Sequence, residues 1–348
     1  MQSLKFTKVE RGEMAEKREL IIMDAVYHIP AMLKETIEGL AIKSDGIYVD
    51  VTFGGGGHSR AILEAISRQP SAISQGHLYS FDQDKDALNN AIEDERWTFV
   101  HSNFRYLWNW MDYYGVKEID GLLADLGVSF HHFDCPERGF SFRFSAPLDM
   151  RMNQTAKRTA ADIVNGYSEE ELANLFYLYG ELKNGRAIAR NICRARTQKA
   201  IERTEDLVKN LTPSLSTREG EMHILENGEI EVPTQYKKDL ARLFQALRIE
   251  VNDEMGALRE MLVAARDLLK PGGRIAILTY HSLEDRLVKN FLRSGNLEGK
   301  IEKDFYGNNL SPFEVIEKGR EASAEEVERN PRARSAKLRV AQKLIIKN

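Results

Sequence analysis

The sequence predicts an α/β fold in which a mostly parallel sheet is covered by helices on both faces. Short apolar, β-branched segments alternate with helical periodicity between residues 46 and 102, a pattern that is typical of βαβ units. Four consecutive glycines, Gly54 to Gly57, follow the first of these segments. A fifth strand-like segment begins only at residue 273, much later than one crossover requires, which indicates a large insertion.

Each strand is predicted from its β-branched and aromatic content and from the turn residues around it. In chain order the predicted strands are GIYVDVTF (46–53), HLYSFDQD (77–84), WTFVHS (97–102), IDGLLADLGVSF (119–130), GRIAILTYHS (273–282, after a KPGG turn), PFEVIEKG (312–319) and KLRVAQKLII (337–346). Helices are predicted at 27–40, 59–67 and 86–95. The first of them is opened by Pro30 and places four apolar residues on one face, namely Met32, Leu33, Ile37 and Leu40.

Residues 136–245 are predicted to be an inserted, largely helical subdomain that recognises the substrate. Within it, residues 169–180 and 183–198 have helical periodicity. Residues 211–235 are polar and rich in turn-forming residues, which predicts a mobile loop. The expected division is therefore a polar N-terminal extension (1–22), a main ligand-binding domain (23–135 and 246–348) and the insertion.

The composition is that of an ordinary globular protein, with 42% hydrophobic and 29% charged residues among 348. No apolar run approaches the roughly 18–20 residues that a membrane span needs. The charged N-terminus lacks the apolar centre of a signal peptide. The lack of a long apolar run predicts no membrane partner. The two cysteines, Cys135 and Cys193, form no ligand cluster with histidine, which predicts a cytoplasmic location and no metal site.

The net charge is −4, so any binding of nucleic acid must come from local basic patches. The segments Lys183–Arg203 and Arg329–Asn348 each hold seven basic residues, with one acid in the first and none in the second. Taken alone, such a patch is more often a solvated surface. In the first patch, three arginines recur every four residues on one helix face beside the predicted site, which favours phosphate binding. They are Arg186, Arg190 and Arg194.

The glycine loop predicts a ligand site, because doubly wound sheets bind ligands at the carboxyl ends of their strands. It has no Lys-Ser or Lys-Thr pair of a Walker loop and lacks the last glycine of the dinucleotide fingerprint. Asp50, four residues before Gly54, gives a spacing that resembles the first motif of S-adenosylmethionine-dependent methyltransferases. Asp82 ends the second strand, where a carboxylate accepts hydrogen bonds from ribose, and Phe104 can pack on adenine. A dehydrogenase also places an acid there, so these residues predict nucleoside binding without fixing the reaction.

Longer segments, which run in order from about residue 27 to 344, narrow the choice of reaction. They are HIPAMLKETIEGL, YVDVTFGGGGHSRAIL, DGLLADLGVS, RGFSF, PLDMRM, TAADIVNGYSEEELANLFYLYGELKNGRAIAR, FQALRIEVNDE, YHSLEDRLVKNF and NPRARSAKLRVAQK. Together they resemble the RsmH (MraW) family of bacterial 16S ribosomal RNA cytosine-N(4)-methyltransferases. This resemblance implies a Rossmann-like class I methyltransferase sheet, with the helical insertion between strands four and five.

The resemblance also implies the cofactor and the partners. The cofactor is S-adenosyl-L-methionine, and the partner is 16S ribosomal RNA or the small ribosomal subunit, with a homodimer as a possible assembly. The chain departs from the family at His132, commonly Gln, at Ser145-Ala146, usually Asp-Gly, and at Asn153, usually Asp. The implied cofactor-binding residues are Gly56, Gly57, His58, Asp82, Phe104, Asp125 and His132.

The acceptor of such a reaction is an exocyclic amine whose lone pair is delocalised into the base, so positioning is the main task. Asp125, at the end of the fourth strand, is predicted to accept the amine protons. Phe130 is expected to receive the unstacked base, and His281, at the end of the fifth strand, is a second candidate proton acceptor or an interior histidine. Contacts with RNA are expected at Arg138, Arg143 and Arg151, just after the fourth strand.

Three alternatives stay open from the sequence. A cytosine C5-methyltransferase needs a cysteine nucleophile, and Cys135 lies ten residues past Asp125, although Cys-Pro is the reverse of the usual order. A dehydrogenase would bind NADH. A non-catalytic ribosome assembly factor would bind RNA without turnover.

Overall fold

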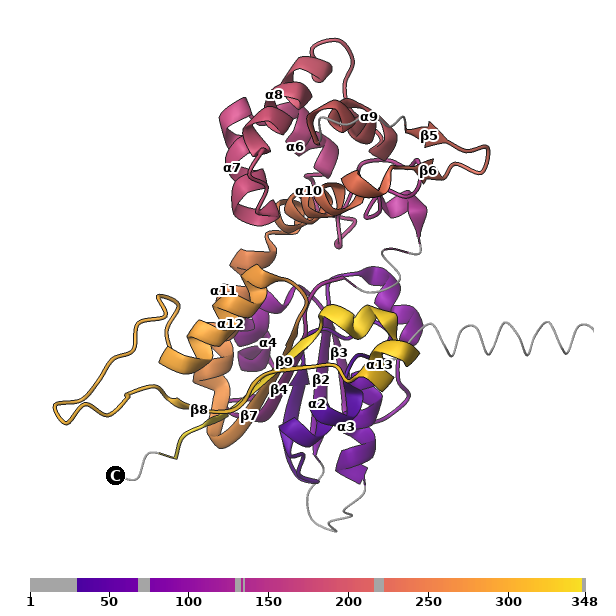
Figure 1. The fold of residues 1–348 in the computed structure, drawn as a ribbon. Coiled ribbons are helices and arrows are strands. Elements are labelled where there is room, and N and C mark those ends of the chain that lie inside the picture. The colour runs from indigo at the N-terminus through magenta and orange to yellow at the C-terminus, as the bar shows by residue number, and fades with distance from the viewer. Residues whose placement is uncertain (1–29, 68–75, 129–132, 134, 216–221, 346–348) are drawn as a thin grey trace, which may run out of the picture.

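The computed structural model describes residues 30–67, 76–128, 133, 135–215 and 222–345. The predicted N-terminal extension, Phe130 and His132 lie outside these described residues. Among the helices in these ranges, none has the length and hydrophobicity needed to cross a lipid bilayer. A sheet flanked by helices forms one part of the molecule, and a group of helices lies beyond one end of the strands (Figure 1).

Seven strands form one sheet in the order β3-β2-β1-β4-β7-β9-β8. The strands from β3 to β7 are parallel, and β9 is antiparallel to both β7 and β8. This mixed sheet confirms the predicted α/β class. The strand order reverses between β1 and β4, so the carboxyl ends of these two strands border the ligand crevice of the fold. The bounds are β1 Ile47–Asp50, β2 His77–Asp82, β3 Trp97–His101, β4 Ile119–Asp125, β7 Leu269–Thr279, β8 Phe313–Glu321 and β9 Lys337–Lys343.

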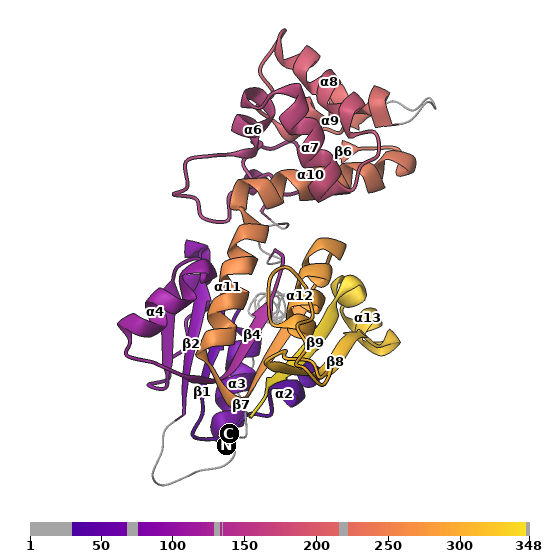
Figure 2. The ribbon, with the colours of Figure 1, turned by 90° about the vertical axis from the view of Figure 1, so that its left-hand side faces the viewer.

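The alternation of side chains along the strands builds a core on each face of the sheet. Tyr48 and Leu123 belong to the core under α2 (Leu33–Leu40) and α3 (Gly57–Ser67). Their neighbours Val49 and Leu122 belong to the opposite core. Figure 2 looks onto the helices that cover this second core, which are α4 (Leu107–Tyr113), α11 (Glu254–Leu268) and α12 (Ser282–Ser294).

Three local predictions were wrong in detail. The first helix begins at Leu33 and not at Pro30, because Met32 has a left-handed backbone (φ 49). The predicted helix 86–95 is only a 3-10 helix, η1 (Lys85–Asn90), which is capped by the side chain of Asp84. The KPGG segment is no turn before the fifth strand but an irregular part of β7, where Gly272 has φ +84.

The helices beyond the sheet have a core of their own, which contains Ile163, Leu172, Phe176 and Ile188. Two of them begin with a capping box, Thr159 with Asp162 and Ser168 with Glu171, in which side chain and backbone satisfy each other's free groups. The bounds are α6 Ala160–Gly166, α7 Glu169–Gly180, α8 Gly185–Arg196, α9 Thr204–Leu215 and α10 Thr234–Asn252.

The mobile loop predicted at 211–235 is corrected where the structure describes it. Helix α9 continues to Leu215, and β5 (His223–Ile224) pairs with β6 (Ile230–Glu231) as an antiparallel hairpin. Asn227-Gly228 lies between them, with Gly228 at φ +81, and this dipeptide favours tight hairpin turns. Residues 216–221 lie outside the described residues.

One helix carries side chains of both cores. Helix α10 continues past residue 245 to Asn252, and α11 follows directly after Asp253. Leu247 belongs to the core beyond the sheet, and Ile249 belongs to a core of the sheet. The remaining helical segments are η2 Phe104–Tyr106, η3 Pro136–Arg138, α13 Ala324–Arg329 and η4 Pro331–Ser335.

Candidate active site

The glycine loop joins β1 to α3 in a conformation that needs glycine. Gly54 and Gly56 have φ values of 50 and 76, where side chains are disfavoured. A Cβ on Gly56 would lie 2.9 Å from the ring of Phe53, and one on Gly57 would lie 2.9 Å from Pro30. The loop therefore brings bare backbone to the end of the strand.

Asp50 supports this loop from beneath. Its carboxylate is fully buried and accepts hydrogen bonds from Oγ of Ser59 (2.6 Å) and the backbone N–H of Thr52 (3.0 Å). Burial raises the pKa of Asp50, against the lowering effect of its hydrogen bond from Ser59. Asp50, the acid of the acid-x-x-x-glycine spacing, therefore fixes the conformation of the turn. It is not among the described residues that line the cavity.

Asp82 lies at the end of β2, beside the glycine loop. Its Oδ2 accepts a hydrogen bond from the N–H of Gly54 and its Oδ1 accepts one from the N–H of Asp84, each at 2.8 Å. Each carboxylate oxygen has a second lone pair. Asp82 lines the cavity, so it can still accept hydrogen bonds from a ligand.

A cavity of about 1030 Å³ opens at the carboxyl ends of the strands. It brings together most of the predicted cofactor-binding and catalytic residues with one predicted RNA contact, and Phe140, Phe142 and Phe144 also line it. Gly56 is not in the lining, and its contact with the cofactor stays a prediction. The predicted residues that line the cavity are Gly57, His58, Asp82, Phe104, Asp125, Arg143 and His281.

Asp125, which lines this cavity, is held in place by Tyr280. The Tyr280 hydroxyl donates a hydrogen bond to Oδ1 of Asp125 at 2.7 Å, and Nδ1 of His58 lies 3.6 Å from Oδ2. Burial raises the pKa of Asp125 to about 7, although the bond from Tyr280 lowers it. Burial also lowers the pKa of His58, which favours a neutral imidazole beside Asp125.

His281 caps α12 and faces Glu284. Its Nδ1 accepts a hydrogen bond from the N–H of Glu284, and its Nε2 lies 3.1 Å from Oε1 of the same residue. Burial would raise the pKa of Glu284, but His281, the N–H of Tyr280 and Arg248 together hold it below its usual value. The imidazole thus has a structural partner at the cavity wall, and its proton-accepting role stays a prediction.

One group among the described residues has the spacing of metal ligands, although the sequence predicted no metal site. The ligand atoms of Glu254, His281 and Glu284 all lie within 4.8 Å of one another. The guanidinium of Arg248 binds both carboxylate oxygens of Glu254, at 2.8 and 2.9 Å. Because that charge is already neutralised, we interpret the group as an ion-pair network that joins α10 and α11 to α12.

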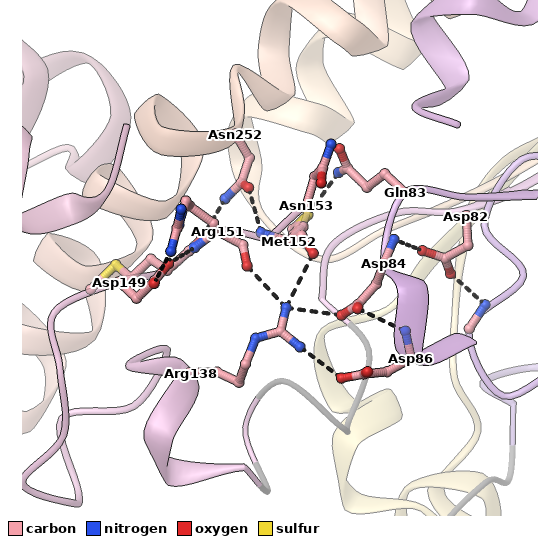
Figure 3. Close-up of polar contacts among 12 residues, drawn as sticks. Asp82, Gln83, Asp84, Asp86, Arg138, Asp149, Arg151, Met152, Asn153 and Asn252 are labelled. Carbon is pink, nitrogen blue, oxygen red and sulfur yellow. Dashed lines mark hydrogen bonds and ion pairs between the residues drawn. The ribbon is translucent and has the colours of Figure 1, made fainter. Parts of the chain in front are cut away.

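The arginines predicted to contact RNA lie in different environments. Arg138 is buried, and its guanidinium binds Asp84 and Asp86 (Figure 3). Arg151 forms a bidentate pair with Asp149, at 2.7 and 2.6 Å. Neither lines the cavity, whereas Arg143 does. Contact between these arginines and RNA stays a prediction.

On α8, the three predicted arginines are exposed, and Ile188 and Ile192 are fully buried behind them. Arg190 is 73% exposed and lies 3.4 Å from Glu169. This arrangement provides a basic helix face on the group of helices beyond the strand ends (Figure 1).

Comparison with known proteins identifies the family of this chain. The sequence matches the MraW methylase family over residues 25–344. The chain belongs to this family. It is 57% identical over 323 residues to the ribosomal RNA small subunit methyltransferase H of Parabacteroides distasonis, which covers 92% of this chain and 99% of the relative. The protein of the same name from Phocaeicola vulgatus is 56% identical over 319 residues, with 91% and 98% covered. A rRNA methylase structure from Streptococcus thermophilus has a TM-score of 0.37 and 12% identity, covering 91% of this chain and 99% of that one.

Membership of the MraW family confirms the methyltransferase class and S-adenosylmethionine as the cofactor. The cavity fits this ligand, because it combines an uncovered glycine backbone, the carboxylate of Asp82 and the ring of Phe104 in one space. Its volume of about 1030 Å³ is at the upper end of the range of about 300–1,000 Å³ for small-ligand sites.

Several residues of the site were not found from the sequence. Tyr280 and Arg248 line the cavity, and Tyr280 holds Asp125. Tyr280 directly precedes His281 and follows the last residue of β7. Its position at the end of a strand could have identified it from the sequence. Arg248 lies inside a helix whose amphipathic pattern carries no such indication.

Proposed function

We propose that this protein transfers a methyl group from S-adenosylmethionine to the exocyclic N4 amine of a cytosine in the decoding region of 16S ribosomal RNA. The observation that supports this most is the single cavity that joins the glycine loop and Asp82 to Asp125 and three phenylalanine rings. One end offers nucleoside-binding groups, and the other offers aromatic faces with a hydrogen-bond acceptor between them. The ribosomal RNA relatives supply the substrate class.

At the cofactor end, Asp82 accepts hydrogen bonds from the ribose hydroxyls, Phe104 packs on the adenine, and the loop at Gly57 and His58 lies against the remainder. The cofactor supplies the methyl group as an electrophilic sulfonium. The residues of the chain bring the amine and this methyl into line and exclude water, which are positioning effects.

At the substrate end, Asp125 accepts a hydrogen bond from the cytosine amine and takes up its proton. Its pKa of about 7 suits a general base near neutral pH. Tyr280 fixes one carboxylate oxygen, and the other, which lies 3.6 Å from Nδ1 of His58, faces the amine. We favour Asp125 over His281, because Nδ1 of His281 caps α12 and its buried Nε2 lies 3.1 Å from the carboxylate of Glu284.

The unstacked base is received among Phe140, Phe142 and Phe144, which line the cavity. Arg143 at the cavity and the exposed arginines of α8 contact RNA phosphates. The helices of residues 136–245 serve as the recognition subdomain, and residues 23–135 and 246–348 bind the cofactor. The enzyme works in the cytoplasm, where its ribosomal substrate is. It acts as a homodimer, which mass photometry of the purified protein would test.

Cytosine C5 transfer is the less favoured reaction. Among the described residues, Phe133 and Pro136 line the cavity, but Cys135 between them does not. A nucleophile must reach the base. If a Cys135→Ser variant lost methyl transfer and kept cofactor binding, the C5 reaction would be preferred.

Mass spectrometry of nucleosides from small-subunit RNA tests the proposal. Cells without the gene are expected to lose one N(4)-methylated cytosine, which the wild-type gene restores and an Asp82→Ala variant does not. Asp45→Ala, at an exposed carboxylate away from the cavity lining, is the matched control and restores the nucleoside. An unchanged modification profile in the deletion strain would contradict the proposed function.

A further inference from the structure

The arginine of the RGFSF segment lies inside the protein at the wall of the site. Arg138 belongs to the lip, which we define as residues 136–153, and the lip contributes Phe140 and Met152 to the cavity. Only 8% of Arg138 is exposed. A buried guanidinium is costly unless it is paired, so its partners show what it holds together.

Those partners come from two separate segments. On one side, Arg138 lies 2.9 Å from Oδ2 of Asp84 and 3.1 Å from Oδ2 of Asp86. On the other side, it donates hydrogen bonds to the backbone carbonyls of Arg151 (2.9 Å) and Met152 (3.1 Å). Figure 3 shows the guanidinium between these two segments.

The acidic side of this contact is continuous with the cofactor site. The N–H of Asp84 donates to Oδ1 of Asp82, whose Oδ2 accepts from the N–H of Gly54. The side chain of Asp84 also caps η1 by accepting from the N–H of Asp86. A shift of Asp84 would therefore move the carboxylate that binds ribose, the glycine loop, or both.

The other side of the contact is continuous with α10. Asn252, at the end of that helix, donates to the carbonyl of Met150 and accepts from the N–H of Met152, each at 2.8 Å (Figure 3). Met150 has a left-handed backbone (φ 63), and its N–H donates to the carbonyl of Arg138 at 3.0 Å. Such conformations persist only where the surroundings hold them. Arg138 and Asn252 hold this one from opposite sides.

From this geometry we infer that Arg138 is a positioning residue, which fastens the base-receiving lip to the cofactor loop so that the cytosine amine meets the methyl group. The inference rests on the proposed function. It replaces the expected RNA contact of Arg138, because the charge of that side chain is engaged within the protein. A misplacement of about 1 Å between reacting groups costs about 100-fold in rate, whereas each ligand keeps most of its own contacts.

The experiment compares Arg138→Met and Asp84→Asn with the wild type. Asn keeps the cap of η1 but removes the charge that pairs with Arg138. Single-turnover methyl transfer to small-subunit RNA is measured with both substrates saturating, beside the Kd values for S-adenosylhomocysteine and for the RNA. Each variant is expected to lose about 100-fold in rate and to keep both Kd values within about threefold. Arg138→Lys is expected to recover part of the rate, and the double variant to be no slower than Arg138→Met.

Arg339→Met is the matched control. Arg339 is 7% exposed and binds both oxygens of Asp285 and the carbonyl of Lys318, so its loss removes a similar buried clamp outside the cavity lining. It is expected to lower Tm and to leave the rate unchanged.

Two results would overturn the inference while the wild type remains active. One is a rate for Arg138→Met within threefold of wild type. The other is a loss of RNA or cofactor affinity that matches the loss of rate, which would mean a phosphate contact or a general structural role. If the wild type itself transferred no methyl group, the proposed function would fail first.

Discussion

At the scale of single residues, we propose that the Asp125–Tyr280 pair sets the pH range of the reaction. Asp125 must be ionised to accept a proton, so activity is expected to rise as the pH passes through its pKa of about 7. The Tyr280 hydroxyl stabilises the ionised form, and a hydrogen bond to a charged group contributes about 1.5–3 kcal/mol, or about one to two pKa units. Tyr280→Phe should therefore move the acidic limb of kcat upward by at least about one pH unit.

The measurement is kcat against pH for both proteins. At pH 6, Tyr280→Phe should be at least about tenfold slower than wild type, because one pKa unit is a factor of about ten below the pKa. The two rates should converge once the pH exceeds both pKa values. Tyr177→Phe, on the exposed side of α7, should leave the profile in place. An equal decrease in kcat at every pH would show that Tyr280 does not act through the ionisation of Asp125.

How far the sequence predicts the site depends on where each residue's partners lie. Asp82 and Asp125 end parallel strands, and this alone directs them to one crevice. Arg138 was predicted to contact RNA, and its partners Asp84 and Asp86, more than fifty residues away in the chain, could not be predicted. Such long-range ion pairs leave no periodic pattern, so burial of a charged side chain is found only in the structure.

At the scale of elements, the lip depends on Gly139. This residue has φ +71, and a Cβ there would lie 2.2 Å from the carbonyl oxygen of Pro147 and 2.9 Å from the N of Asp149. Gly139→Ala should lower the free energy of unfolding by about 1–3 kcal/mol and reduce methyl transfer, because the lip must shift.

The measurements are denaturant unfolding and methyl transfer at saturating substrates. Gly166→Ala is the matched control, since a Cβ on Gly166 meets nothing within 4 Å. It should be neutral or stabilising by up to about 1 kcal/mol. Equal effects of the two substitutions on the free energy of unfolding and on methyl transfer would show that the lip accommodates a Cβ at Gly139 without a loss of stability.

The basic face of α8 gives a second prediction at this scale. Each lysine or arginine that neutralises a phosphate adds about 0.7–0.9 to the slope of log K against log salt. Replacing Arg186, Arg190 and Arg194 with Gln should reduce that slope by about 2. The affinity for S-adenosylhomocysteine should not change. RNA affinity is measured at salt concentrations from about 50 to about 200 mM. As the control, Lys34→Gln on α2 should keep the wild-type slope.

The elements that the sequence failed to predict share a physical reason. Residues 86–95 have helical periodicity, but the side chain of Asp84 caps a tight turn and the helix ends at Asn90. Residues 211–235 are polar, yet Ile230 and Val232 are buried against the helices. In both segments tertiary contacts, with Arg138 in the first and with the helical core in the second, outweigh local composition. The long buried strands, where periodicity and burial agree, were predicted correctly.

At the scale of the whole molecule, the two parts are expected to unfold together. Helix α10 has Leu243 and Leu247 in one core and Ile249 in another, with no break between them. The cavity is also lined from both parts, by Phe244 and Arg248 of α10 as well as by Asp82 and Asp125 of the strands. A ligand in this cavity should therefore stabilise both parts.

Calorimetry with S-adenosylhomocysteine tests this coupling. At about 100 times its Kd, a ligand that binds only the folded state adds about 2.7 kcal/mol to the free energy of unfolding. We expect one transition, which moves upward as a unit in the wild type and stays in place at the same ligand concentration in Asp82→Ala. If two transitions were resolved and only one moved, the cores would unfold independently, and α10 would not couple cofactor binding to the stability of the helices beyond the sheet.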